Sequence, residues 1–333
     1  MRDSKITIAD VAEALHVSKT TVSRAISGKG RISDETRQRV LSYIEAKDFK
    51  PNAIAKGLAQ KKTYNIAFVI PGDCNLVDMP FFQNSMQGIC EEASANDYDV
   101  MLVPVTGRHS GNLERMIANK KVDGVILSRS LVRDTNAALL EEEKIPFVMM
   151  GTSRDAKILQ VDNNHQAGCC ALVSRMLNSG TVRIGLIGGS KNYVVNRTRK
   201  QGYEDAFQAV GIEPDAALCI EDCDSVEKVA SATEKLVQLG VGAIVCMDDF
   251  VCSVALQVLA GKKIQVPQQI QIASFYDSTL LKYAKPAITS LWFDDRALGA
   301  LTCKVLLQYI QGIKAESKTL LGYELVIRES TLF

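Results

Sequence analysis

The chain has 333 residues, is 47% hydrophobic and carries a formal net charge of +1. This near-neutral total conceals an asymmetry, because residues 1–62 hold 13 Lys and Arg against 7 Asp and Glu, while the remainder holds 26 against 31. A basic head indicates a polyanionic partner for the head alone. We find no secretory signal and no run of about 18 apolar residues, which argues against an exported solute-binding protein or a membrane protein. The nine scattered Cys suit a reducing cytoplasm.

The first 26 residues predict two short helices around a tight turn. Thr7 and Asp10 can satisfy the free amides of a first helix, and Ser18 is the expected cap of a second. One apolar face of each helix is expected to pack against the other. The residues of these two faces are Val11, Leu15, Val22, Ala25 and Ile26.

Four polar residues of the second helix would then point outward: Lys19, Thr20, Ser23 and Arg24. An Arg can donate two hydrogen bonds to O6 and N7 of guanine in the major groove, and Ser and Thr hydroxyls can reach phosphates or base edges. The alternative is an ordinary small three-helix unit, which capped patterns of this kind also build. The positive charge of the segment favours the interpretation as a DNA-binding unit.

A third helix and a short fourth one are predicted further along the head. Ser33 to Thr36 indicates a helix start, and the expected core residues of this third helix are Val40, Leu41 and Ile44. Phe49-Lys-Pro51 should end it, and Asn52 can cap the fourth. A helix this short, weakened further by Gly57, is marginal in water. We therefore predict that the hinge, residues 52–60, is disordered without DNA and folds on binding it.

These motifs resemble those of the lactose and galactose repressor family of bacterial transcription regulators. The shared pattern runs Thr-Ile-x-Asp-Val-Ala, Val-Ser-x-x-Thr-Val-Ser-Arg, Ser-Asp-Glu-Thr-Arg-x-x-Val and Lys-Pro-Asn-Ala-x-Ala-x-x-Leu, and the likeness continues to Glu324–Ser330. The resemblance implies a second helix in the major groove of a pseudo-palindromic operator and a hinge helix in its minor groove. Leu58 would be an apolar wedge that kinks the duplex. A core position is the alternative for Leu58.

The resemblance also implies roles for single residues of the head. The expected base readers are Lys19, Thr20 and Arg24, the expected backbone contacts are Ser23, Ser33, Thr36 and Asn52, and Thr7 and Ser18 complete the DNA-binding set. Two departures from the family pattern limit how far these residue roles can be assigned to this chain. His16 lies in the turn where the family often has Gly or Asn, and Phe49 replaces a Tyr found in some members. Lys19 and Thr20 also differ from the well-known members, so we expect a different operator.

From Tyr64 onward, apolar strand-like runs alternate with helical stretches. The strand-like runs are 66–70, 100–103, 124–127, 147–150, 184–187, 243–246 and 270–272, and examples of the helical stretches are 83–96, 164–178, 225–239 and 294–311. Continuous apolar runs are typical of strands buried on both faces, and strict alternation with helices implies parallel sheets. The predicted fold class is therefore α/β.

The resemblance adds an architecture of two such lobes, as in type I periplasmic sugar-binding proteins. We expect a helix-turn-helix head at 1–50, a hinge helix and linker at 51–62, and an effector-binding and dimerisation domain at 63–333. Lobe 1 would take about 63–161 and 291–319, and lobe 2 about 162–290 and 320–333. Ligands of open α/β sheets bind beyond the carboxyl ends of strands, so the cleft between the lobes is the expected effector site.

Six residues are candidates for effector binding: Phe82, Asp162, Arg199, Asp249, Tyr276 and Asp277. By resemblance, Phe82 would lie against a ligand ring and Arg199 would fork onto ligand hydroxyls or a carboxylate, which suits a planar guanidinium. Core packing is the alternative for Phe82, as helix capping is for Asp162 and Asp249.

Tyr276 is the most consequential departure, because family members commonly have a carboxylate in its place. A phenol offers a single hydrogen bond and no charge, so either Asp277 compensates or the effector differs in class. Trp292 and Phe293 fall at a crossing between the lobes. They either make the cleft more aromatic or pack between the lobes.

The sequence contains no recognisable catalytic constellation. The three His lack metal-like spacing, no Gly-x-Ser-x-Gly elbow or Lys-containing phosphate loop occurs, and Cys219 and Cys223 lack a second pair for zinc. We therefore predict a non-enzymatic, cytoplasmic, nucleoid-associated transcription regulator acting as a repressor. It would bind double-stranded operator DNA as a homodimer under control of a small, sugar-like effector, with no cofactor, metal or membrane partner.

Overall fold

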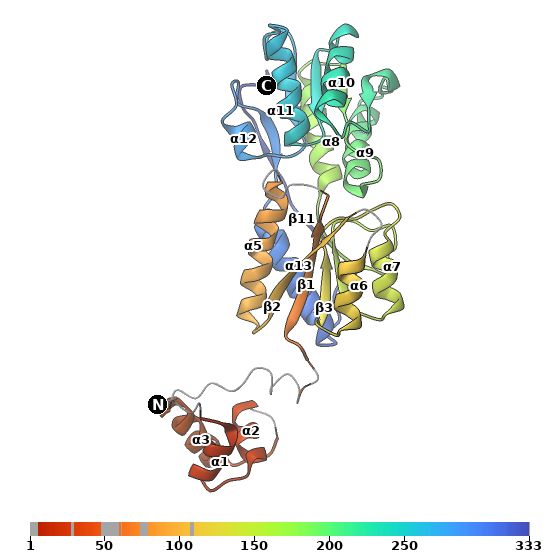
Figure 1. The fold of residues 1–333 in the computed structure, drawn as a ribbon. Coiled ribbons are helices and arrows are strands. Elements are labelled where there is room, and N and C mark those ends of the chain that lie inside the picture. Colours follow the sequence, from red (N-terminus) through yellow and green to blue (C-terminus); the bar gives the residue numbers. More distant parts are fainter. Residues whose placement is uncertain are drawn as a thin grey trace. The chain divides into compact units, whose positions relative to one another are not determined.

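The computed structural model describes residues 6–27, 30–47, 60, 62–73, 79–106 and 110–332. The chain divides into two compact units, Met1–Thr63 and Tyr64–Phe333, called here the head and the effector unit (Figure 1). Phe49, Asn52 and Leu58 lie outside the described residues, as does the predicted hinge apart from Gln60. The predictions about them therefore stay predictions.

In its described residues the head contains three helices, α1 (Ile8–Ala14), α2 (Lys19–Ser27) and α3 (Asp34–Ala46). Thr7 and Asp10 form a capping box: Thr7 Oγ1 accepts from the Asp10 amide at 3.3 Å, and the Asp10 carboxylate accepts from the Thr7 amide at 2.7 Å. Ser18 Oγ accepts from the Thr21 amide at 3.0 Å, and Ser33 Oγ accepts from the Thr36 amide at 3.2 Å. The three helix starts expected from the sequence are confirmed.

A small apolar core joins the three helices of the head. Val11, Ala12, Val22, Ala25 and Val40 are buried together, with Leu15, Ile26 and Ile44 packed against them. The prediction that Leu41 belongs to this core is wrong, because its side chain is 38% exposed. Successive helical residues are about 100° apart, so the face of α3 that contains Val40 continues at Tyr43 and Ile44 rather than at Leu41.

The turn between α1 and α2 places His16 at a φ of 50°, in the left-handed region. Arg39 on α3 donates a hydrogen bond from Nη2 to the carbonyl of Leu15 at 2.9 Å, next to this turn. The backbone therefore adopts a conformation that Gly or Asn would accept at lower cost than His.

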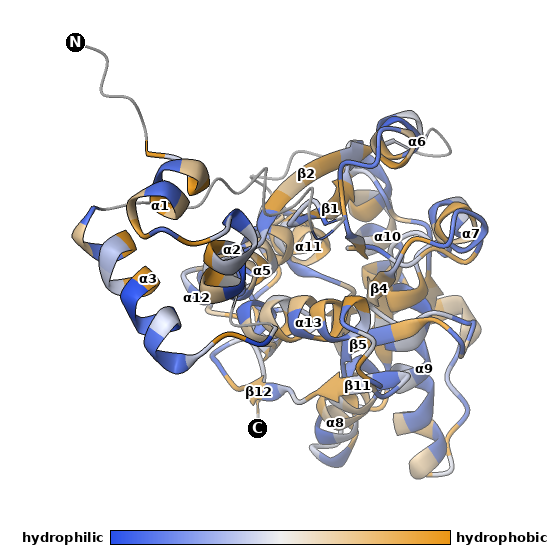
Figure 2. Cartoon of the chain, turned by 90° about the horizontal axis from the view of Figure 1, so that it is seen from below, coloured by the Kyte–Doolittle hydropathy of each residue, from blue (hydrophilic) through white to orange (hydrophobic). Residues whose placement is uncertain are grey.

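Lobe 1 of the effector unit is a six-stranded parallel sheet in the order β11-β5-β4-β3-β1-β2. Its strands are β1 (Asn65–Pro71), β2 (Asp99–Val105), β3 (Gly124–Leu127), β4 (Phe147–Met150), β5 (Leu159–Asn163) and β11 (Lys318–Leu321), and its helices are α5 (Pro80–Ala95), α6 (Gly111–Ala118), α7 (Thr135–Glu142) and α13 (Asp295–Ile310). Along β1, alternate residues enter two cores, one shared with α5 and α13 and the other with α6 and α7. In Figure 2, hydrophobic residues follow β2 and β4, whereas α6 and α7 carry many hydrophilic residues.

Lobe 2 is a second six-stranded sheet, in the order β12-β10-β9-β8-β6-β7. Its strands are β6 (Ile184–Ile187), β7 (Cys219–Ile220), β8 (Ala243–Cys246), β9 (Gln271–Ser274), β10 (Thr289–Trp292) and β12 (Glu324–Val326), and its helices are α8 (His165–Asn178), α9 (Val194–Ala209), the 3-10 helix η2 (Ala216–Leu218), α10 (Val226–Gln238), α11 (Asp249–Gly261) and α12 (Thr279–Lys282). One edge departs from the all-parallel prediction, because β12 runs antiparallel to β10. The chain reaches β12 directly from lobe 1 and not through a crossover helix, so the usual constraint on strand direction does not apply.

The α/β fold class is confirmed, and each predicted strand-like run falls on an observed strand. The chain passes between the lobes after β5, after β10 and after β11, each of which ends two residues beyond the expected lobe boundary. No helix in the described ranges combines the length and apolar character that a membrane span requires.

Glycines allow two pairs of helices to pack closely, α5 with α13 in lobe 1 and α8 with α9 in lobe 2. A Cβ atom at Gly299 of α13 would collide with the backbone carbonyl of Ser85 on α5, and one at Gly88 would collide with the carbonyl of Arg296. In lobe 2, a Cβ at Gly202 of α9 would collide with the carbonyl of Gln166 on α8. These contacts fix the helices on which Asp295 and Arg199 are carried.

Candidate functional site

The head presents a polar face on α2. Ser18, Lys19, Thr20, Ser23 and Arg24 are exposed, whereas Val22 and Ala25 point into the core. The predicted DNA-contacting residues of the second helix therefore share one solvent-facing surface. Cationic and hydroxyl side chains on the first turns of such a helix can reach both phosphates and base edges.

Hydroxyls at the helix starts contribute a second set of predicted contacts. Thr7, Ser18 and Ser33 are exposed and cap their helices, and Thr36 is half-buried with its Oγ1 2.8 Å from Ser33 Oγ. Amides at a helix start attract phosphate, so these positions suit backbone contacts.

The stem of Arg24 is held close to Gly30. Gly30 has a φ of 91°, and a Cβ built on it would lie 3.0 Å from Arg24 Cδ and 3.1 Å from Cγ and Nε. A side chain at position 30 would therefore push on Arg24. Sequence reasoning did not identify this contact, because it depends on the path of the chain beyond α2.

The effector unit contains a buried polar group of residues where the two lobes meet. Arg199 on α9 lies at its centre, 93% buried, and Nη1 donates to the carbonyl of Met247, just after β8, at 2.7 Å. Its Nε has no hydrogen-bond partner among the described residues. Burial raises the pKa values of Asp162, Asp248 and Asp295, and the charge of the Arg199 guanidinium partly opposes this rise, so these carboxyl groups lie within its electrostatic range.

Asp162 on β5 is buried and accepts two hydrogen bonds, from Thr152 Oγ1 and from the Asn163 amide, both at 2.8 Å. Burial raises the pKa of Asp162 to about 6, against the opposing effect of these hydrogen bonds. The alternative that Asp162 caps a helix is wrong, because Asn164 caps α8 by accepting from the Ala167 amide at 3.3 Å.

His165, the first residue of α8, lies against this carboxylate. Its Nε2 is 3.6 Å from Asp162 Oδ1, and its ring meets Phe293 edge-on at 4.5 Å between centroids. Burial and the charge of Arg199 hold the pKa of His165 well below its usual range, so the imidazole is neutral. Phe293 therefore packs at the lobe junction, while Trp292 is exposed.

Tyr276 makes a hydrogen bond that joins the two lobes. It follows β9 of lobe 2, and its phenol donates to Oδ2 of Asp295, the first residue of α13 in lobe 1, at 2.5 Å. Both groups are buried; desolvation raises the pKa of Asp295 to about 7 and raises the pKa of Tyr276 as well. The Arg199 guanidinium lies 6.0 Å from the phenol ring. The carboxylate that family members commonly have at position 276 is thus replaced by that of Asp295, which belongs to lobe 1.

Asp248 and Asp249 follow β8 and have different roles. Asp248 caps α11 by accepting from the Val251 amide at 2.9 Å, so the capping alternative applies to Asp248 and not to Asp249. Asp249 is half-buried at the first position of α11. Burial raises the pKa of both carboxyl groups. Asp249 stays a candidate for ligand contact.

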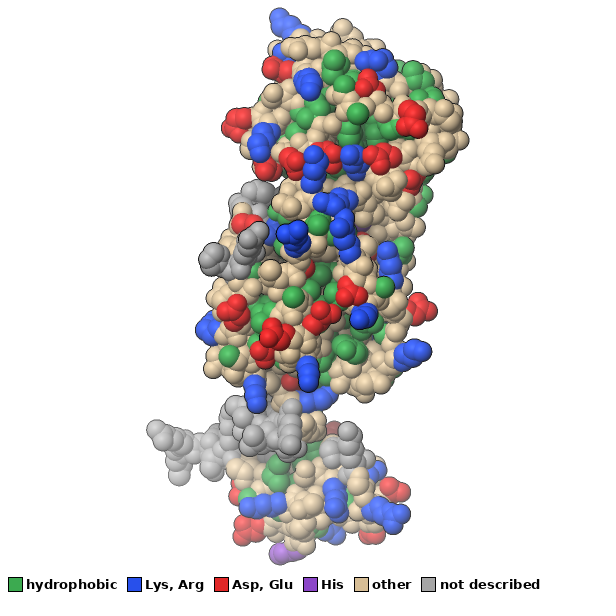
Figure 3. All heavy atoms as spheres, turned by 90° about the vertical axis from the view of Figure 1, so that its right-hand side faces the viewer, with side chains coloured by type: hydrophobic (Ala, Val, Ile, Leu, Met, Phe, Trp, Pro, Cys, Tyr) green, Lys and Arg blue, Asp and Glu red, His purple; other side chains and the backbone are tan. Residues whose placement is uncertain are grey.

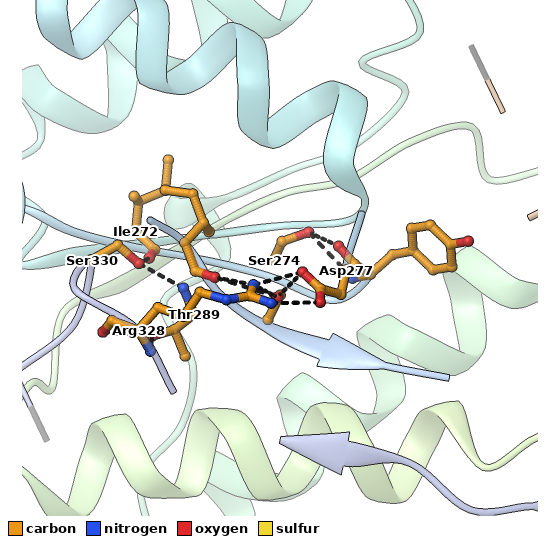
Figure 4. Close-up of polar contacts among 9 residues, drawn as sticks. Ile272, Ser274, Asp277, Thr289, Arg328 and Ser330 are labelled. Carbon is orange, nitrogen blue, oxygen red and sulfur yellow. Dashed lines mark hydrogen bonds and ion pairs between the residues drawn. The ribbon is translucent and has the colours of Figure 1, made fainter. Parts of the chain in front are cut away.

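Asp277 is held in an ion pair within lobe 2 (Figure 4). Its Oδ1 accepts from Arg328 Nη1 at 2.6 Å and its Oδ2 from Arg328 Nη2 at 2.8 Å, and Ser290 Oγ donates to Oδ1 at 2.5 Å. Arg328 also donates to the Ile288 carbonyl at 2.7 Å. With both oxygens paired, Asp277 anchors the C-terminal segment and cannot compensate for Tyr276 in the way the sequence left open.

Phe82 is buried near the start of α5 and meets Phe81 edge-on at 5.1 Å. Phe81 in turn packs against a core of each lobe. This packing favours the core interpretation of Phe82 over ligand stacking.

The lobes also meet through backbone contacts that the sequence did not predict. Leu131, beyond β3, forms an antiparallel bridge with Tyr193, and the Val132 amide donates to the Asn192 carbonyl at 2.9 Å. Arg129 donates to the Tyr193 hydroxyl at 3.1 Å and contacts Asp73 at 3.3 Å. Lobe 1 and lobe 2 are therefore in direct contact beyond the chain crossings.

Sequence reasoning missed Asn163, His165, Asp248 and Asp295 as members of the interlobe group. The Asp294-Asp295 pair precedes a helix, where acidic residues are ordinary caps, and Asp294 does cap α13 by accepting from the Ala297 amide at 2.9 Å. The position of Asn163 at a strand end was a usable signal, since it adjoins the predicted Asp162.

A three-helix head with a polar recognition surface, followed by two α/β lobes with a buried polar group between them, defines a ligand-regulated DNA-binding protein. Comparison with known proteins specifies the family. Residues 7–52 match the family of bacterial regulatory proteins, lacI family, and residues 173–331 match the periplasmic binding protein-like domain.

Relatives match over nearly the whole chain. The HTH-type transcriptional regulator DegA of Bacillus subtilis (strain 168) is 30% identical over 337 residues, covering 98% of each chain. The HTH-type transcriptional regulator MalR of Streptococcus pneumoniae serotype 4 is 31% identical over 318 residues, covering 93% of this chain and 94% of the relative. The chain belongs to the lacI family of bacterial regulatory proteins, which are DNA-binding transcription regulators.

Solved structures agree with this fold. A transcriptional regulator CelR–cellobiose complex is 27% identical, with a TM-score of 0.74 and coverage of 98% of this chain and 100% of that one. The lac repressor dimer bound to operator has a TM-score of 0.79 at 23% identity, covering 99% and 100%. The resemblance to the lactose and galactose repressor family predicted from the sequence is confirmed.

Proposed function

We propose that this protein is a repressor that binds a pseudo-palindromic operator as a homodimer and is controlled by a sugar-like molecule in the interlobe site. The observation that supports this proposal is that one chain combines an exposed cationic surface with a buried polar site. The head exposes cations and hydroxyls on α2, while the effector unit buries polar atoms without partners around Arg199. The first suits a polyanion and the second suits a small polar ligand.

In the head, we assign base contacts to Lys19, Thr20 and Arg24. Ser23, Ser33 and Thr36 would contact the backbone, together with Asn52, and Leu58 would enter the minor groove. An Arg or Lys paired with guanine contributes about 1–3 kcal/mol of discrimination against a wrong base. Two heads on one operator would double the number of these contacts.

In the effector unit, the interlobe group suits a polyhydroxylated ligand. Arg199 Nε can donate, and Asn163 has both an amide donor and an amide acceptor without a hydrogen bond of ordinary geometry to the described residues. Sugar hydroxyls donate and accept, so one molecule can satisfy both kinds of atom. The cellobiose complex of the related CelR is a precedent for a sugar in this fold.

Exposed apolar side chains support the homodimer. Met79 precedes α5, Leu102 lies on β2, Phe250 lies on α11, Leu280 lies on α12 and Tyr283 follows it. Figure 1 shows α5, β2, α11 and α12 along one side of the effector unit. The opposite side, seen in Figure 3, carries acidic and basic side chains interspersed with hydrophobic ones. Exposed apolar residues along one side of both lobes suit a lengthwise pairing of two copies.

Ligand and operator would be coupled through the lobes. Both lobes contribute to the interlobe group, so a ligand that binds there has different contacts in different lobe arrangements. Any change it makes in operator affinity must be matched by an equal effect of operator on ligand affinity. The regulator would act in the cytoplasm, where its DNA lies, and the interlobe site would bind its ligand without transforming it.

The DNA part of the proposal is tested by selecting duplexes from a random library and measuring affinity by fluorescence anisotropy. We expect a palindromic consensus and an affinity that falls steeply with salt. Arg24→Ala should weaken binding about 10-fold or more and relax preference at one base pair of each half-site. Arg31→Ala, which removes the same charge from an exposed position outside α2, should weaken binding without changing the preferred sequence. Equal effects of both variants on sequence preference would contradict the assignment of Arg24.

The ligand part is tested by a thermal-shift screen of sugars, sugar phosphates and nucleobases. Arg199→Ala should abolish the shift produced by any ligand found. The matched control is Arg197→Ala, which should keep the shift, because Arg197 lies on the same helix but is exposed and donates from Nε to the Lys191 carbonyl at 2.8 Å. An undiminished shift in the Arg199 variant would refute its role.

A further inference from the structure

Buried polar atoms without partners are concentrated at the junction of the lobes. Those around Arg199 are Oδ1 and Nδ2 of Asn163, Nδ1 of His165, Nε of Arg199 and Oδ1 of Asp295. All four residues are more than nine-tenths buried. A buried polar atom without a hydrogen bond costs about 1–3 kcal/mol, so such atoms are normally satisfied by water or by a ligand. Their concentration at one place indicates a site that is completed from outside the chain.

Asp295 occupies an unusual position in this group. Its Oδ2 is fixed by the Tyr276 phenol at 2.5 Å, which leaves Oδ1 to face the other groups of the junction. Asn163 lies close enough to lower the pKa of Asp295, but no hydrogen bond of ordinary geometry joins the two side chains. The carboxylate of Asp295, which belongs to lobe 1, is therefore oriented by Tyr276 of lobe 2. Its Oδ1 remains a free acceptor.

The charges around this acceptor are unbalanced. Three carboxyl groups, those of Asp162, Asp248 and Asp295, are within electrostatic range of a single buried guanidinium, Asp249 adjoins Asp248, and His165 is neutral. Lys318 adds a weaker positive influence on Asp162, and Asp294 adds a negative one on Asp295. Burial raises the pKa of each of the four carboxyl groups, and the opposing charge of Arg199 on Asp162, Asp248 and Asp295 does not reverse this rise, so without a further cation these groups are neutralised by protons.

We propose that Asp295 is a ligand-binding residue and that the ligand is a polyhydroxy compound carrying a protonated amine, such as an amino sugar, whose ammonium lies against Asp295 Oδ1. Tyr276 positions the carboxylate. This inference rests on the proposed function, because it specifies the ligand of the same interlobe site. A neutral sugar could satisfy the free donors and acceptors, but it would leave the Asp295 carboxyl group to be neutralised by a proton. An ammonium satisfies the Oδ1 acceptor and stabilises the charged carboxylate in place of that proton.

The inference is tested by isothermal titration calorimetry on the full chain with matched compounds. The probes are D-glucosamine, D-galactosamine and D-mannosamine, each compared with its neutral parent sugar and its neutral N-acetyl derivative, at a pH of about 6.5 where the amine is protonated. We expect at least one amine to bind about 10-fold or more tighter than both neutral counterparts. A neutral sugar that binds as tightly as its amine, or failure of every amine to bind, overturns the inference.

Variants identify the carboxylate responsible. Asp295→Asn keeps the size of the side chain and should remove the preference for the amine, while Tyr276→Phe should reduce it several-fold. Asp294→Asn is the matched control: it makes the same charge change at the exposed neighbouring position and keeps a capping side chain, so the preference should persist. A preference that survives in Asp295→Asn overturns the assignment.

The outcomes separate this inference from the proposed function. If neutral sugars bind and shift operator affinity while amines have no advantage, the interlobe site is a sugar site and only the charge assignment fails. If selected operator DNA is not bound, the proposed function itself fails. Thermal unfolding of the effector unit shows whether Asp295→Asn is folded, and the comparison of compounds on the unmodified chain does not depend on any variant.

Discussion

The head and the effector unit recognise their targets by opposite physical means. The head has a core of five fully buried apolar residues and keeps its recognition side chains in solvent, where they lose little hydration before DNA arrives. The effector unit has four large cores and places its charged site residues between them, more than nine-tenths buried in the case of Arg199 and Asp295. Exposed charges suit long-range attraction to a polyanion, and buried charges suit selection of one small molecule.

This difference has a consequence for mutation. In the head, a change to a recognition residue should alter binding and leave the free energy of unfolding nearly unchanged. In the effector unit, site residues are also structural, so function and stability should change together. The following experiments test where this separation holds.

The largest effect is expected for Arg328→Met, which would leave Asp277 buried and without its guanidinium partner. Loss of one partner of a buried ion pair costs about 3–5 kcal/mol, so the free energy of unfolding of the effector unit should fall by about that amount. Denaturant unfolding measures it. Arg296→Met breaks an exposed pair with Glu91, whose contact is 2.6 Å, and should cost less than about 1 kcal/mol. Similar losses in both variants would show that the Asp277 pair has no special weight.

A smaller loss is expected for Gly299→Ala. The added methyl group would meet the Ser85 carbonyl, forcing α13 away from α5 at a cost of about 1–3 kcal/mol in the free energy of unfolding. Because α13 begins with Asp295, ligand affinity should fall as well. Gly261→Ala is the control, since no atom lies within 4 Å of its added Cβ. Thermal unfolding should show no loss there, and an equal loss would contradict the close-packing argument.

The two units should respond to pH in opposite directions. Burial raises the pKa of Asp162 to about 6 and that of Asp295 to about 7, from 3.8, so the folded effector unit binds protons that the unfolded chain releases. Its free energy of unfolding should therefore fall as pH rises from about 4 to about 7, by about 1.4 kcal/mol per pH unit for each proton held. Asp10 in the head has a lowered pKa through its hydrogen bonds with Thr7, so its contribution is lost as pH falls below about 4.

Thermal midpoints of the two units from about pH 2 to about pH 8 measure this contrast. Asp295→Asn should flatten the slope of the effector unit and leave the head unaffected. A slope that Asp295→Asn does not change would show that other groups bind the protons.

The smallest effect is expected for His16→Gly. His16 has a φ of 50°, which glycine adopts without steric cost, so the free energy of unfolding of the head should rise by about 0.5–1 kcal/mol. Lys47→Gly is the control, because the φ of Lys47 is −106° and glycine gains nothing there. Operator affinity should be unchanged in both variants. A loss of stability in His16→Gly would mean that the His side chain contributes more than its backbone conformation costs.

Most of the correct predictions depended on local sequence patterns. The capping box of Thr7 and Asp10, the caps Ser18 and Ser33 and the apolar runs of the strands each depend on residues a few positions apart, and each is confirmed. Leu41 was misplaced because a run of three apolar candidates does not by itself fix which side of the helix is buried.

The interlobe group was harder to predict because its contacts join residues far apart in sequence. Arg199 was selected by resemblance, but the hydrogen bond from Tyr276 to Asp295 joins the segment after β9 in lobe 2 to the start of α13 in lobe 1. Asp277 looked like a free carboxylate because its partner, Arg328, is 51 residues further along the chain. Pairings of this kind depend on topology, which propensity and periodicity do not contain.

The late strands of the effector unit impose an order on biosynthesis. Lobe 1 lacks α13 and β11 until residue 321 has been made, and lobe 2 lacks β12 and the Arg328 anchor until a few residues later. The head needs only the segment up to Ala46 for its three helices. On the ribosome, the DNA-binding unit can therefore fold while about 280 residues up to Arg328 are still to be added, whereas both lobes of the sensor are completed almost together, once the segment that contains β11, β12 and Arg328 has been made.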